Sequence, residues 1–258
     1  MVGKDIFSLD GKVALVVGGT GGIGSAIALG FAQFGADVAV AGRSQDRGEK
    51  VAARIQALGR RGLFASVEVQ EKESVEAMVE KVIAGLGRID ILVNCAGINR
   101  RVNAEEASVE DWDAVVNINL KGTFLVSQAV GRHMIARSGG GKIVNISSLR
   151  GELGMPMGYT AYCASKAGVN MFTKQLANEW GRFGIKVNAI APGWTRTDIV
   201  RPLLERPGFI EGLQKRTPLG RMAEPDDLVG ASIFLASPAS DFITGHILTA
   251  DGGLSGVQ

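Results

Sequence analysis

The feature that most constrains the fold is the alternation of short apolar runs with longer segments of helical periodicity. The runs are continuous in Val, Ile, Leu and Ala, as in KVALVV (12–17), DVAVAG (37–42) and IDILVN (89–94). A strand without a polar face is covered on both sides, which is typical of parallel sheets with helical connections. The pattern therefore predicts an α/β fold, a doubly wound parallel sheet with helices on both faces.

Seven strands and five long helices are expected in one domain spanning residues 1–258. The other four strands are predicted at 62–69, 141–148, 185–192 and 246–253, and the helices at 22–35, 46–59, 73–87, about 108–137 and about 160–182. One segment, 193–220, breaks the rhythm: it carries three prolines and is longer than an ordinary connection. It is either a substrate lid at the carboxyl end of the sixth strand or a surface insertion.

Composition excludes several classes of protein. The formal net charge is only +2 and the charges are dispersed, so nucleic-acid binding is not expected. The N-terminus lacks the apolar run of a signal peptide, and no window approaches the ~18 apolar residues of a membrane span. Cys95 and Cys163 match no metal-ligand spacing, and His133 and His246 are isolated, so no metal site is expected. These features favour a cytoplasmic protein with free thiols and a small-molecule partner.

A glycine-rich loop follows the first predicted strand and opens the first predicted helix. In VVGGTGGIGSAIA, glycines 18, 22 and 24 give G-x-x-x-G-x-G, and glycines 19, 21 and 24 give G-x-G-x-x-G. Residues without a Cβ allow a tight turn and let backbone N–H groups approach a pyrophosphate at the helix N-terminus. In this strand–turn–helix setting the loop predicts dinucleotide binding.

The end of the second predicted strand indicates which dinucleotide is bound. An NAD site usually has an acidic residue there to bind the ribose 2′-hydroxyl. This chain has Gly42 followed by Arg43. An arginine attracts a 2′-phosphate and can bind it with a fork of donors. NADP(H) is therefore favoured, with NAD(H) as the alternative cofactor and a solvated loop charge as the alternative for Arg43.

Both tyrosines of the chain lie in YTAYCASK, which begins at Tyr159. Lys166 lies four residues after Tyr162, so a helix places the two on one face. A free tyrosine has a pKa near ~10 and transfers protons poorly at neutral pH. A nearby ammonium favours the phenolate and lowers that pKa. Tyr162 is therefore the candidate acid or base, whereas Tyr159 has no such partner.

With these residues in view, the chain resembles the short-chain dehydrogenase/reductase family over essentially its whole length. The matching motifs, in order, are the glycine loop (18–24), NCAG (94–97), NINLKG (117–122), NISS (145–148), YCASK (162–166) and PGWTRT (192–197). The resemblance implies a Rossmann fold, hydride transfer between a nicotinamide and a carbonyl or alcohol, and a homotetramer built from helices 108–137 and 160–182 with the C-terminal strand region.

The resemblance also implies a role for each matching residue. Ser148, rather than Ser147, would bind the substrate oxygen, Tyr162 would exchange a proton with it, and Lys166 would hold the nicotinamide ribose and lower the tyrosine pKa. Asn119 would help to hold a water molecule between the lysine and solvent. The cofactor set is Gly18, Thr20, Gly21, Gly22, Ile23, Gly24, Arg43, Ser44, Glu68, Val69, Asn94, Ala96, Gly97, Tyr162, Lys166, Pro192, Gly193, Thr195 and Thr197.

This chain departs from the family pattern at a few positions. Val17 stands where Thr is frequent, Cys95 replaces the second Asn of N-N-A-G, and Glu68 stands where an Asp commonly contacts adenine. One residue more than is common separates Ser148 from Tyr162. None of these changes removes a group that the hydride chemistry needs.

The substrate is indicated mainly by similarity to particular members of the family. FSLDGKVALV, INRR, LANEW and RTPLGR resemble sugar-acid dehydrogenases that act on gluconate or 2-keto-3-deoxygluconate. Arg100, Arg101 or Arg150 could hold the carboxylate with a fork of donors, with Ser148 and Tyr162 at the reacting oxygen. The alternatives are a 3-oxoacyl-carrier-protein reductase, whose surface arginines would receive an acidic carrier, and a non-catalytic dinucleotide sensor.

Overall fold

The computed structural model describes residues 5–256, which form one seven-stranded sheet that is parallel throughout. The strand order is β3-β2-β1-β4-β5-β6-β7. This confirms the predicted Rossmann fold. The strands are β1 (Val13–Val17), β2 (Asp37–Gly42), β3 (Gly62–Ser66), β4 (Ile91–Asn94), β5 (Gly141–Ile146), β6 (Ile185–Pro192) and β7 (Ile247–Ala250).

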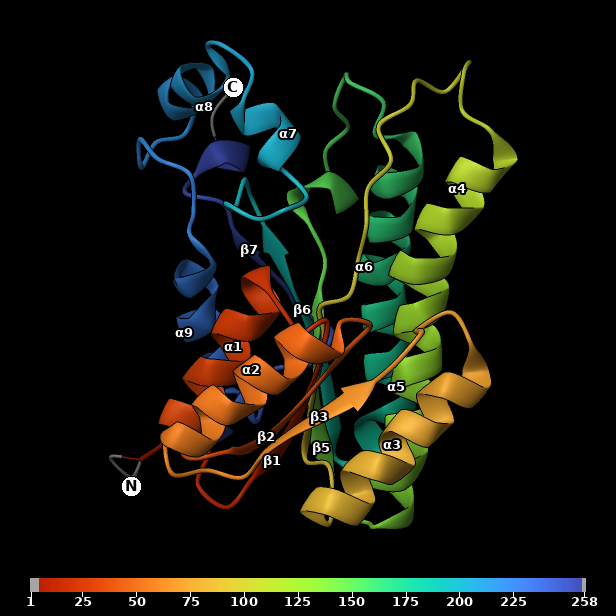
Figure 1. Cartoon of the computed structure of the whole chain (residues 1–258), viewed down its shortest axis with the longest axis vertical. Coiled ribbons are helices and arrows are strands. Elements are labelled where there is room, and N and C mark those ends of the chain that lie inside the picture. The colour runs from red at the N-terminus through yellow and green to blue at the C-terminus, as the bar shows by residue number, and fades with distance from the viewer. Residues whose placement is uncertain (1–4, 257–258) are drawn as a thin grey trace.

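Helices cover both faces of the sheet, as Figure 1 shows. On one face lie α1 (Gly22–Gln33), α2 (Gln45–Ala57) and α9 (Val229–Ala236). On the other face lie α3 (Lys72–Leu86), α5 (Gly122–Ala136) and α6 (Thr160–Trp180). The connections run first over one face, then over the other, and return to the first face with α9, which makes the fold doubly wound.

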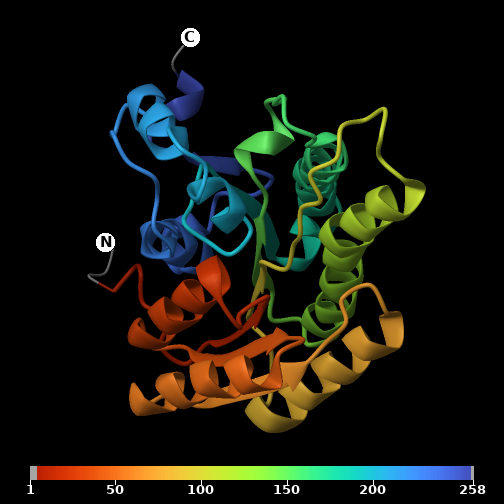
Figure 2. The ribbon, with the colours of Figure 1, turned by 45° about the horizontal axis from the view of Figure 1, so that its top comes forward.

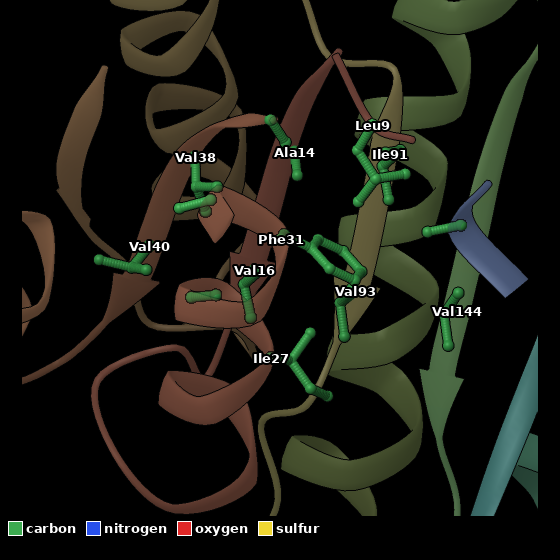
Figure 3. Close-up of a cluster of buried hydrophobic side chains, with 14 of the residues drawn as sticks. Leu9, Ala14, Val16, Ile27, Phe31, Val38, Val40, Ile91, Val93 and Val144 are labelled. Atoms are coloured by element: carbon green, nitrogen blue, oxygen red, sulfur yellow. The ribbon is translucent and has the colours of Figure 1, made fainter. Parts of the chain in front are cut away.

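Strand β1 illustrates why the strands read as continuous apolar runs. All five of its residues are buried, because successive side chains point to opposite faces and both faces are covered. Ala14 and Val16 join the core under α1, whereas Leu15 joins the core under α5. Figure 3 shows the first of these cores, where Phe31 and Ile27 of α1 pack against the sheet. Burial of each such large side chain contributes about 2 kcal/mol.

The strand order reverses between β1 and β4, since β2 follows β1 on one side and β4 pairs with it on the other. At such a switch point the loops at the carboxyl ends of the two strands diverge and leave a crevice. The glycine loop leaves β1 at this point, and NCAG leaves β4 beside it. The topology therefore places the two motifs together.

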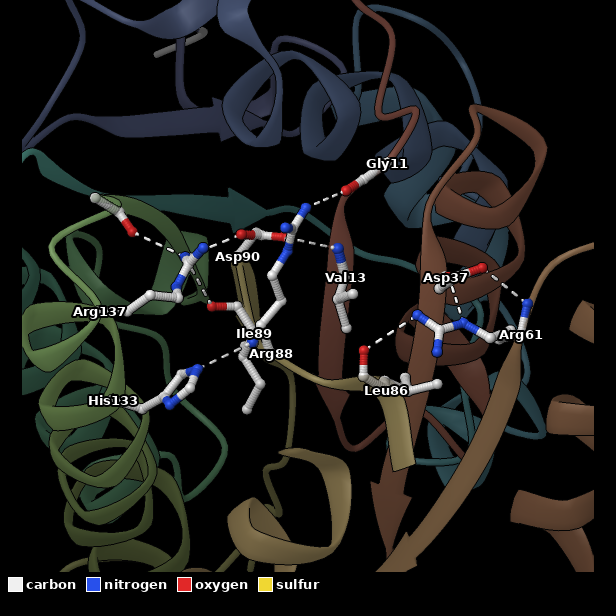
Figure 4. A network of polar contacts seen from close by, with 11 residues as sticks. Gly11, Val13, Asp37, Arg61, Leu86, Arg88, Ile89, Asp90, His133 and Arg137 are labelled. Carbon is white, nitrogen blue, oxygen red and sulfur yellow. Dashed lines mark hydrogen bonds and ion pairs between the residues drawn. The ribbon is translucent and has the colours of Figure 1, made fainter. Parts of the chain in front are cut away.

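Two carboxylates fasten the opposite, amino-terminal end of the sheet, as Figure 4 shows. Asp90 accepts hydrogen bonds from the backbone N–H of Val13 at 2.9 Å and from Arg88 Nε at 2.8 Å, and its other oxygen pairs with Arg137 Nη2 at 2.9 Å. The buried carboxylate of Asp90 thus ties β1 to β4 and to the end of α5. Asp37 makes a similar clamp with Arg61 across β2 and β3.

Some predicted boundaries were wrong. The third strand ends at Ser66 instead of residue 69, because β3 is an edge strand and its pairing with β2 ends at Gly42. The long helix predicted at 108–137 is divided into α4 (Val109–Val116), a π-helical turn (Asn117–Lys121) and α5. Ser108 caps its start as expected, since its hydroxyl accepts from the N–H of Asp111.

The segment 193–220 folds as a small unit of its own. It contains the short helices α7 (Arg201–Leu204) and α8 (Phe209–Arg216) and lies at the top of the molecule in Figures 1 and 2. Val200 and Leu213 of the segment form a small apolar cluster with Met222, and Trp194, Leu204 and Leu254 pack against them. This cluster is separate from the two cores of the sheet, and it joins the segment to Met222 and Leu254 outside it.

The Asp90 clamp gives a test of how the sheet is stabilised. Replacing Asp90 by Asn removes the negative charge that Arg88 and Arg137 share and weakens the hydrogen bonds that their guanidinium groups donate. We therefore expect a loss of about 2 kcal/mol in the free energy of unfolding. Urea unfolding followed by circular dichroism measures this. The matched control is Asp46→Asn, which removes an exposed i,i+4 pair with Lys50 and should change stability little. Equal effects of the two variants would contradict the clamp.

Candidate active site

A groove of about 580 Å³ lies along the carboxyl ends of the strands, on both sides of the switch point. Its walls come from the loops after β1, β2, β3, β4, β5 and β6 and from α6. Most residues predicted from the sequence line it together: Gly18, Thr20, Gly21, Gly22, Ile23, Arg43, Ser44, Glu68, Val69, Ala96, Gly97, Ser148, Tyr162, Lys166, Pro192, Gly193, Thr195 and Thr197. Motifs spread over the whole sequence therefore converge on one site.

Glycines close the turn after β1 by allowing close backbone contacts. A Cβ on Gly18 would lie 2.6 Å from the backbone nitrogen of Ala96, and the residue has a positive φ of 81°. A Cβ on Gly24 would overlap the carbonyl oxygen of Gly18. Gly22 begins α1 and lines the groove, so the N-terminus of this helix is exposed to an anion bound there.

Two predicted cofactor residues lie beneath the groove and do not line it. Gly24 packs α1 against the loop, as described above. Asn94 is buried, and its side-chain nitrogen donates to Ser127 Oγ and to Asn145 Oδ1, both at 2.9 Å. Both residues therefore support the walls of the site, which is a role that the motif alone does not distinguish from ligand contact.

The end of the groove beyond β2 is positively charged. Arg43 and Arg47 both line it, and Arg43 forms no ion pair within residues 5–256. Between the strand and these arginines, Gly42 carries no side chain, and a Cβ there would crowd Thr20 Cγ2 at 2.9 Å. Two guanidinium groups around a position without a side chain fit a phosphate on an adenosine ribose. Arg47 comes from the first turns of α2 and was not predicted from the sequence.

Tyr162 and Ser148 meet at the other end of the groove. The Ser148 hydroxyl accepts from the backbone N–H of Arg150 at 3.1 Å and lies close enough to the phenol of Tyr162 to influence its ionisation. Burial raises the pKa of Tyr162 to about 12, and the neighbouring Ser148 hydroxyl opposes that rise. The phenol is therefore protonated at neutral pH and can donate its proton to an oxygen that enters the groove.

Lys166 lies directly beside the phenol. Its Nζ is 5.8 Å from the centre of the Tyr162 ring and donates to the carbonyl of Ile146 at 2.7 Å. Only 5% of the residue is exposed, and burial lowers the pKa of its ammonium to about 8. The sequence predicted that Lys166 lowers the pKa of Tyr162, but in this structure burial, which raises that pKa, has the largest effect. One α6 face does hold both residues, as expected.

Asn119 lies in the π-helical turn and is fully buried. Its side chain accepts from the N–H of Ile98 at 2.8 Å and donates to the carbonyl of Ile98 at 3.0 Å and to Ser165 Oγ at 3.0 Å. Asn119 Oδ1 and Lys166 Nζ both lie within 3.6 Å of the position of a Cβ on Gly97. The amide therefore joins the loop after β4 to α6, next to the lysine.

The structure separates the roles of the two neighbouring serines. Ser147 Oγ lies 2.5 Å from Asn170 Oδ1 and 3.3 Å from the carbonyl oxygen of Lys166, so its hydroxyl bonds to α6. Ser148 Oγ instead lies beside Tyr162, whose pKa it lowers, and lines the groove. Ser148 is thus the serine placed for a substrate oxygen, in agreement with the choice made from the sequence.

The three candidate arginines have different surroundings. Arg100 pairs with Asp111 at 2.5 Å, which neutralises its charge. Arg101 bonds to neutral groups, and Arg150 donates to the carbonyls of Leu153 and Gly154. Burial lowers the pKa of Arg150, whose guanidinium lies 6.0 Å from the ring of Trp194. None of the three arginines lines the groove itself. Arg101 bonds to Ile199 and Arg150 to Ser148, which both line it, so these two arginines are the ones free to bind an anion beside the groove.

Besides its predicted residues, the segment 193–220 lines the groove with three residues that the sequence did not predict, Asp198, Ile199 and Val200. Asp198 lies 3.8 Å from Arg47, and Thr197 Cγ2 is 3.4 Å from the position of a Cβ on Gly22. These contacts connect the segment to the glycine loop. In the sequence, Asp198 is visible only as an acid directly after the T-R-T motif, and this position does not indicate a role until its contact with Arg47 is known.

Residues 5–256 bring together no group of three or more acidic, histidine or cysteine side chains that could hold a metal ion. None of their helices is long and apolar enough to span a bilayer.

Comparison with known proteins gives consistent relatives. Residues 18–255 match the family model described as enoyl-(acyl carrier protein) reductase. Gluconate 5-dehydrogenase of Gluconobacter oxydans is 42% identical over 251 residues, which cover 97% of each chain. D-threitol dehydrogenase of Mycolicibacterium smegmatis is 44% identical over 249 residues, 96% of this chain and 94% of the relative.

A solved structure is similarly close. The crystal structure of a gluconate 5-dehydrogenase from Burkholderia cenocepacia in complex with NADP and tartrate superposes with a TM-score of 0.94. It is 43% identical and covers 98% of this chain and 99% of its own. The seven-stranded fold is therefore shared along the whole length of these proteins.

The low pKa of Lys166 predicts how stability depends on pH. Below pH 8 the lysine is protonated in both folded and unfolded chains, and burying its charge destabilises the fold. Between pH 8 and the ordinary value of 10.5, the folded chain has lost the proton that the unfolded chain still binds, so stability rises with pH. Relative to Lys166→Met, the free energy of unfolding of the wild type, measured in urea, should rise by up to about 3 kcal/mol across this window. A difference that does not change with pH would contradict the burial of a titrating ammonium.

Proposed function

Because the chain belongs to the short-chain dehydrogenase/reductase family, we propose that it interconverts a secondary alcohol and a ketone on a sugar acid, such as gluconate or 2-keto-3-deoxygluconate, with NADP(H). The observation that carries the proposal is the contact of Ser148 with Tyr162 beside the buried Lys166, at one end of the groove. An oxidoreductase needs a buried phenol placed beside a serine hydroxyl and a lysine, whereas a non-catalytic sensor does not.

The residues of the cluster divide the work of the reaction. A bound nicotinamide cofactor supplies or accepts the hydride. Ser148 holds the substrate oxygen at the phenol, and Tyr162 donates its proton to that oxygen when a ketone is reduced. Lys166 lies near enough to stabilise the phenolate that is left, and Asn119 would help to hold a water molecule between the lysine and solvent. In the oxidation of an alcohol the proton returns to Tyr162.

Replacing Tyr162 by Phe tests this assignment. The variant keeps the ring but lacks the proton, so turnover should fall by a factor of at least about 100. NADPH binding, followed by quenching of the chain's tryptophan fluorescence, should change little because the glycine loop and Arg43 are intact. Ser147→Ala is the matched control, since that serine bonds within the fold, and it should keep most of the activity. Retained turnover in Tyr162→Phe would contradict the mechanism.

We propose NADP(H) as the cofactor on the charge of the groove. Arg43 and Arg47 line its adenosine end, and no side chain stands at Gly42, where an acid would exclude a 2′-phosphate. NADP in the similar Burkholderia cenocepacia structure supports the same choice.

The cofactor choice is tested by reversing the charge at Arg43. In Arg43→Asp the kcat/KM for NADPH should fall by about 10- to 100-fold, because a hydrogen-bonded charge pair is replaced by repulsion. The kcat/KM for NADH should change much less. Arg54→Asp makes the same charge change on the exposed side of α2 and serves as the control. A parallel loss for both cofactors would remove Arg43 from the 2′-phosphate site.

The segment 193–220 is proposed to be a lid over this groove within the single domain 1–258. It packs around an apolar cluster separate from the cores of the sheet, and its Thr197 and Asp198 lie next to the glycine loop and Arg47. Closure over bound cofactor and substrate would exclude water from the reacting atoms. Hydrogen exchange in this segment that NADP does not slow would argue against a lid.

A sugar acid is favoured over other alcohols by the unneutralised arginines near Tyr162. Arg101 and Arg150 can bind a carboxylate, and the relatives that act on gluconate support an acidic substrate. A carrier-protein reductase is the alternative, which the description of the matching family model favours. D-threitol dehydrogenase, at 44% identity, indicates that neutral polyols also occur as substrates among the relatives.

We propose that the enzyme assembles as a homotetramer. Large apolar side chains remain exposed on the helices expected to form the interface: Trp112 on α4, Phe124 on α5 and Met171 on α6 are 40%, 41% and 63% exposed. Phe242, shortly before β7, is fully exposed as well. Such surfaces are typical of contacts between subunits. Sedimentation velocity measures the assembly directly, and a monomer would contradict it.

A cytoplasmic location is proposed for the same enzyme. Cys95 and Cys163 are both free thiols, which is usual for proteins of a reducing compartment. Cell fractionation of the producing organism would test this, and recovery outside the cytoplasm would contradict it.

A further inference from the structure

The second tyrosine, Tyr159, has surroundings that the proposed chemistry does not use. It is 6% exposed, and its hydroxyl accepts a hydrogen bond from Arg101 Nε at 3.0 Å. Its ring packs edge-on against the ring of Tyr162, with 5.8 Å between the ring centres. Tyr159 therefore contacts Tyr162, the candidate proton donor, on one side and Arg101, which could bind the substrate carboxylate, on the other.

Arg101 is held between two elements by neutral groups. Besides the Tyr159 hydroxyl, it donates from Nη2 to the carbonyl of Ile199 at 2.8 Å, in the proposed lid. Its guanidinium lies 5.6 Å from the centre of the Tyr159 ring. Among residues 5–256 it pairs with no carboxylate, in contrast to Arg100, which pairs with Asp111. Its full positive charge is therefore available to an anion.

The geometry also leaves donors of Arg101 available. A guanidinium has five N–H groups, and the two bonds described use one on Nε and one on Nη2. Nη1 makes no hydrogen bond within the described part of the chain. Both N–H groups of Nη1 are therefore available to a carboxylate. The Tyr159 hydroxyl, which bonds to Nε, fixes the arginine without occupying them.

We propose that Tyr159 is a positioning residue that holds Arg101 for the carboxylate of the substrate and sets its spacing from Tyr162. This inference rests on the proposed function, since it assumes an acidic substrate. An arginine side chain loses considerable rotamer freedom when it is fixed, and a site that fixes it in advance binds its ligand more tightly. One ring in contact with both Arg101 and Tyr162 keeps the carboxylate and the reacting oxygen at a constant separation.

The test compares three variants with D-gluconate and saturating NADP⁺. Tyr159→Phe keeps the ring but removes the hydroxyl, so the KM for gluconate should rise about 3- to 10-fold with kcat changed less than about 2-fold. Arg101→Ala should raise the KM about 10- to 100-fold. Because Tyr159 acts through Arg101, the double variant should be no worse than Arg101→Ala alone. Arg100→Ala, whose arginine already pairs with Asp111, is the matched control.

The outcomes separate this inference from the proposed function. An unchanged KM in Arg101→Ala, or no turnover of sugar acids at all, would overturn the acidic-substrate proposal and the inference with it. A raised KM in Arg101→Ala together with an unchanged KM in Tyr159→Phe would overturn the role of Tyr159 alone. A fall in kcat for Tyr159→Phe, or a further loss in the double variant, would show that the residue acts through Tyr162 or through packing, and would also overturn it.

Discussion

The close contact of Gly18 with the backbone of Cys95 and Ala96 is the constraint on which the site depends. It closes the loop after β1 against the end of β4, where the strand order of the sheet reverses. Any side chain at Gly18 would push the two strand ends apart, and its backbone would also lie in an unfavourable region. The narrow turn leaves the N-terminus of α1 facing the groove, so the fold itself provides the anion site.

The chemistry at the far end depends on burial of two ionisable groups. Lys166 and Tyr162 lie on one face of α6, and burial shifts both towards their neutral forms. A neutral phenol is the form that can donate a proton to the oxygen of a ketone while the ketone is reduced. A lysine with a pKa of about 8 can still be charged at neutral pH. Asn119 and Ser148 complete the arrangement from two other elements, a π-helical turn and the end of β5.

The sequence predicted the fold and most of the groove because both depend on local patterns. Continuous apolar strands need cover on two faces, and parallel strands bring their carboxyl ends to one edge, so Gly18, Ser148 and Pro192 had to converge. Arg47, Asp198 and the Arg101–Tyr159 bond could not be predicted, because each depends on a contact between distant segments. Asn94 and Gly24 illustrate the opposite limit, since a motif does not distinguish a ligand contact from a support beneath it.

The central claim, that a hydride enzyme uses this groove for sugar acids, is tested most directly by a pair of initial rates. NADPH oxidation is followed by its near-ultraviolet absorbance with 5-keto-D-gluconate and, separately, with an acetoacetyl thioester. We expect clear preference for the sugar acid, because Arg101 and Arg150 provide unneutralised positive charge near Tyr162. Preference for the thioester would contradict it and would assign the arginines to the docking of a carrier protein.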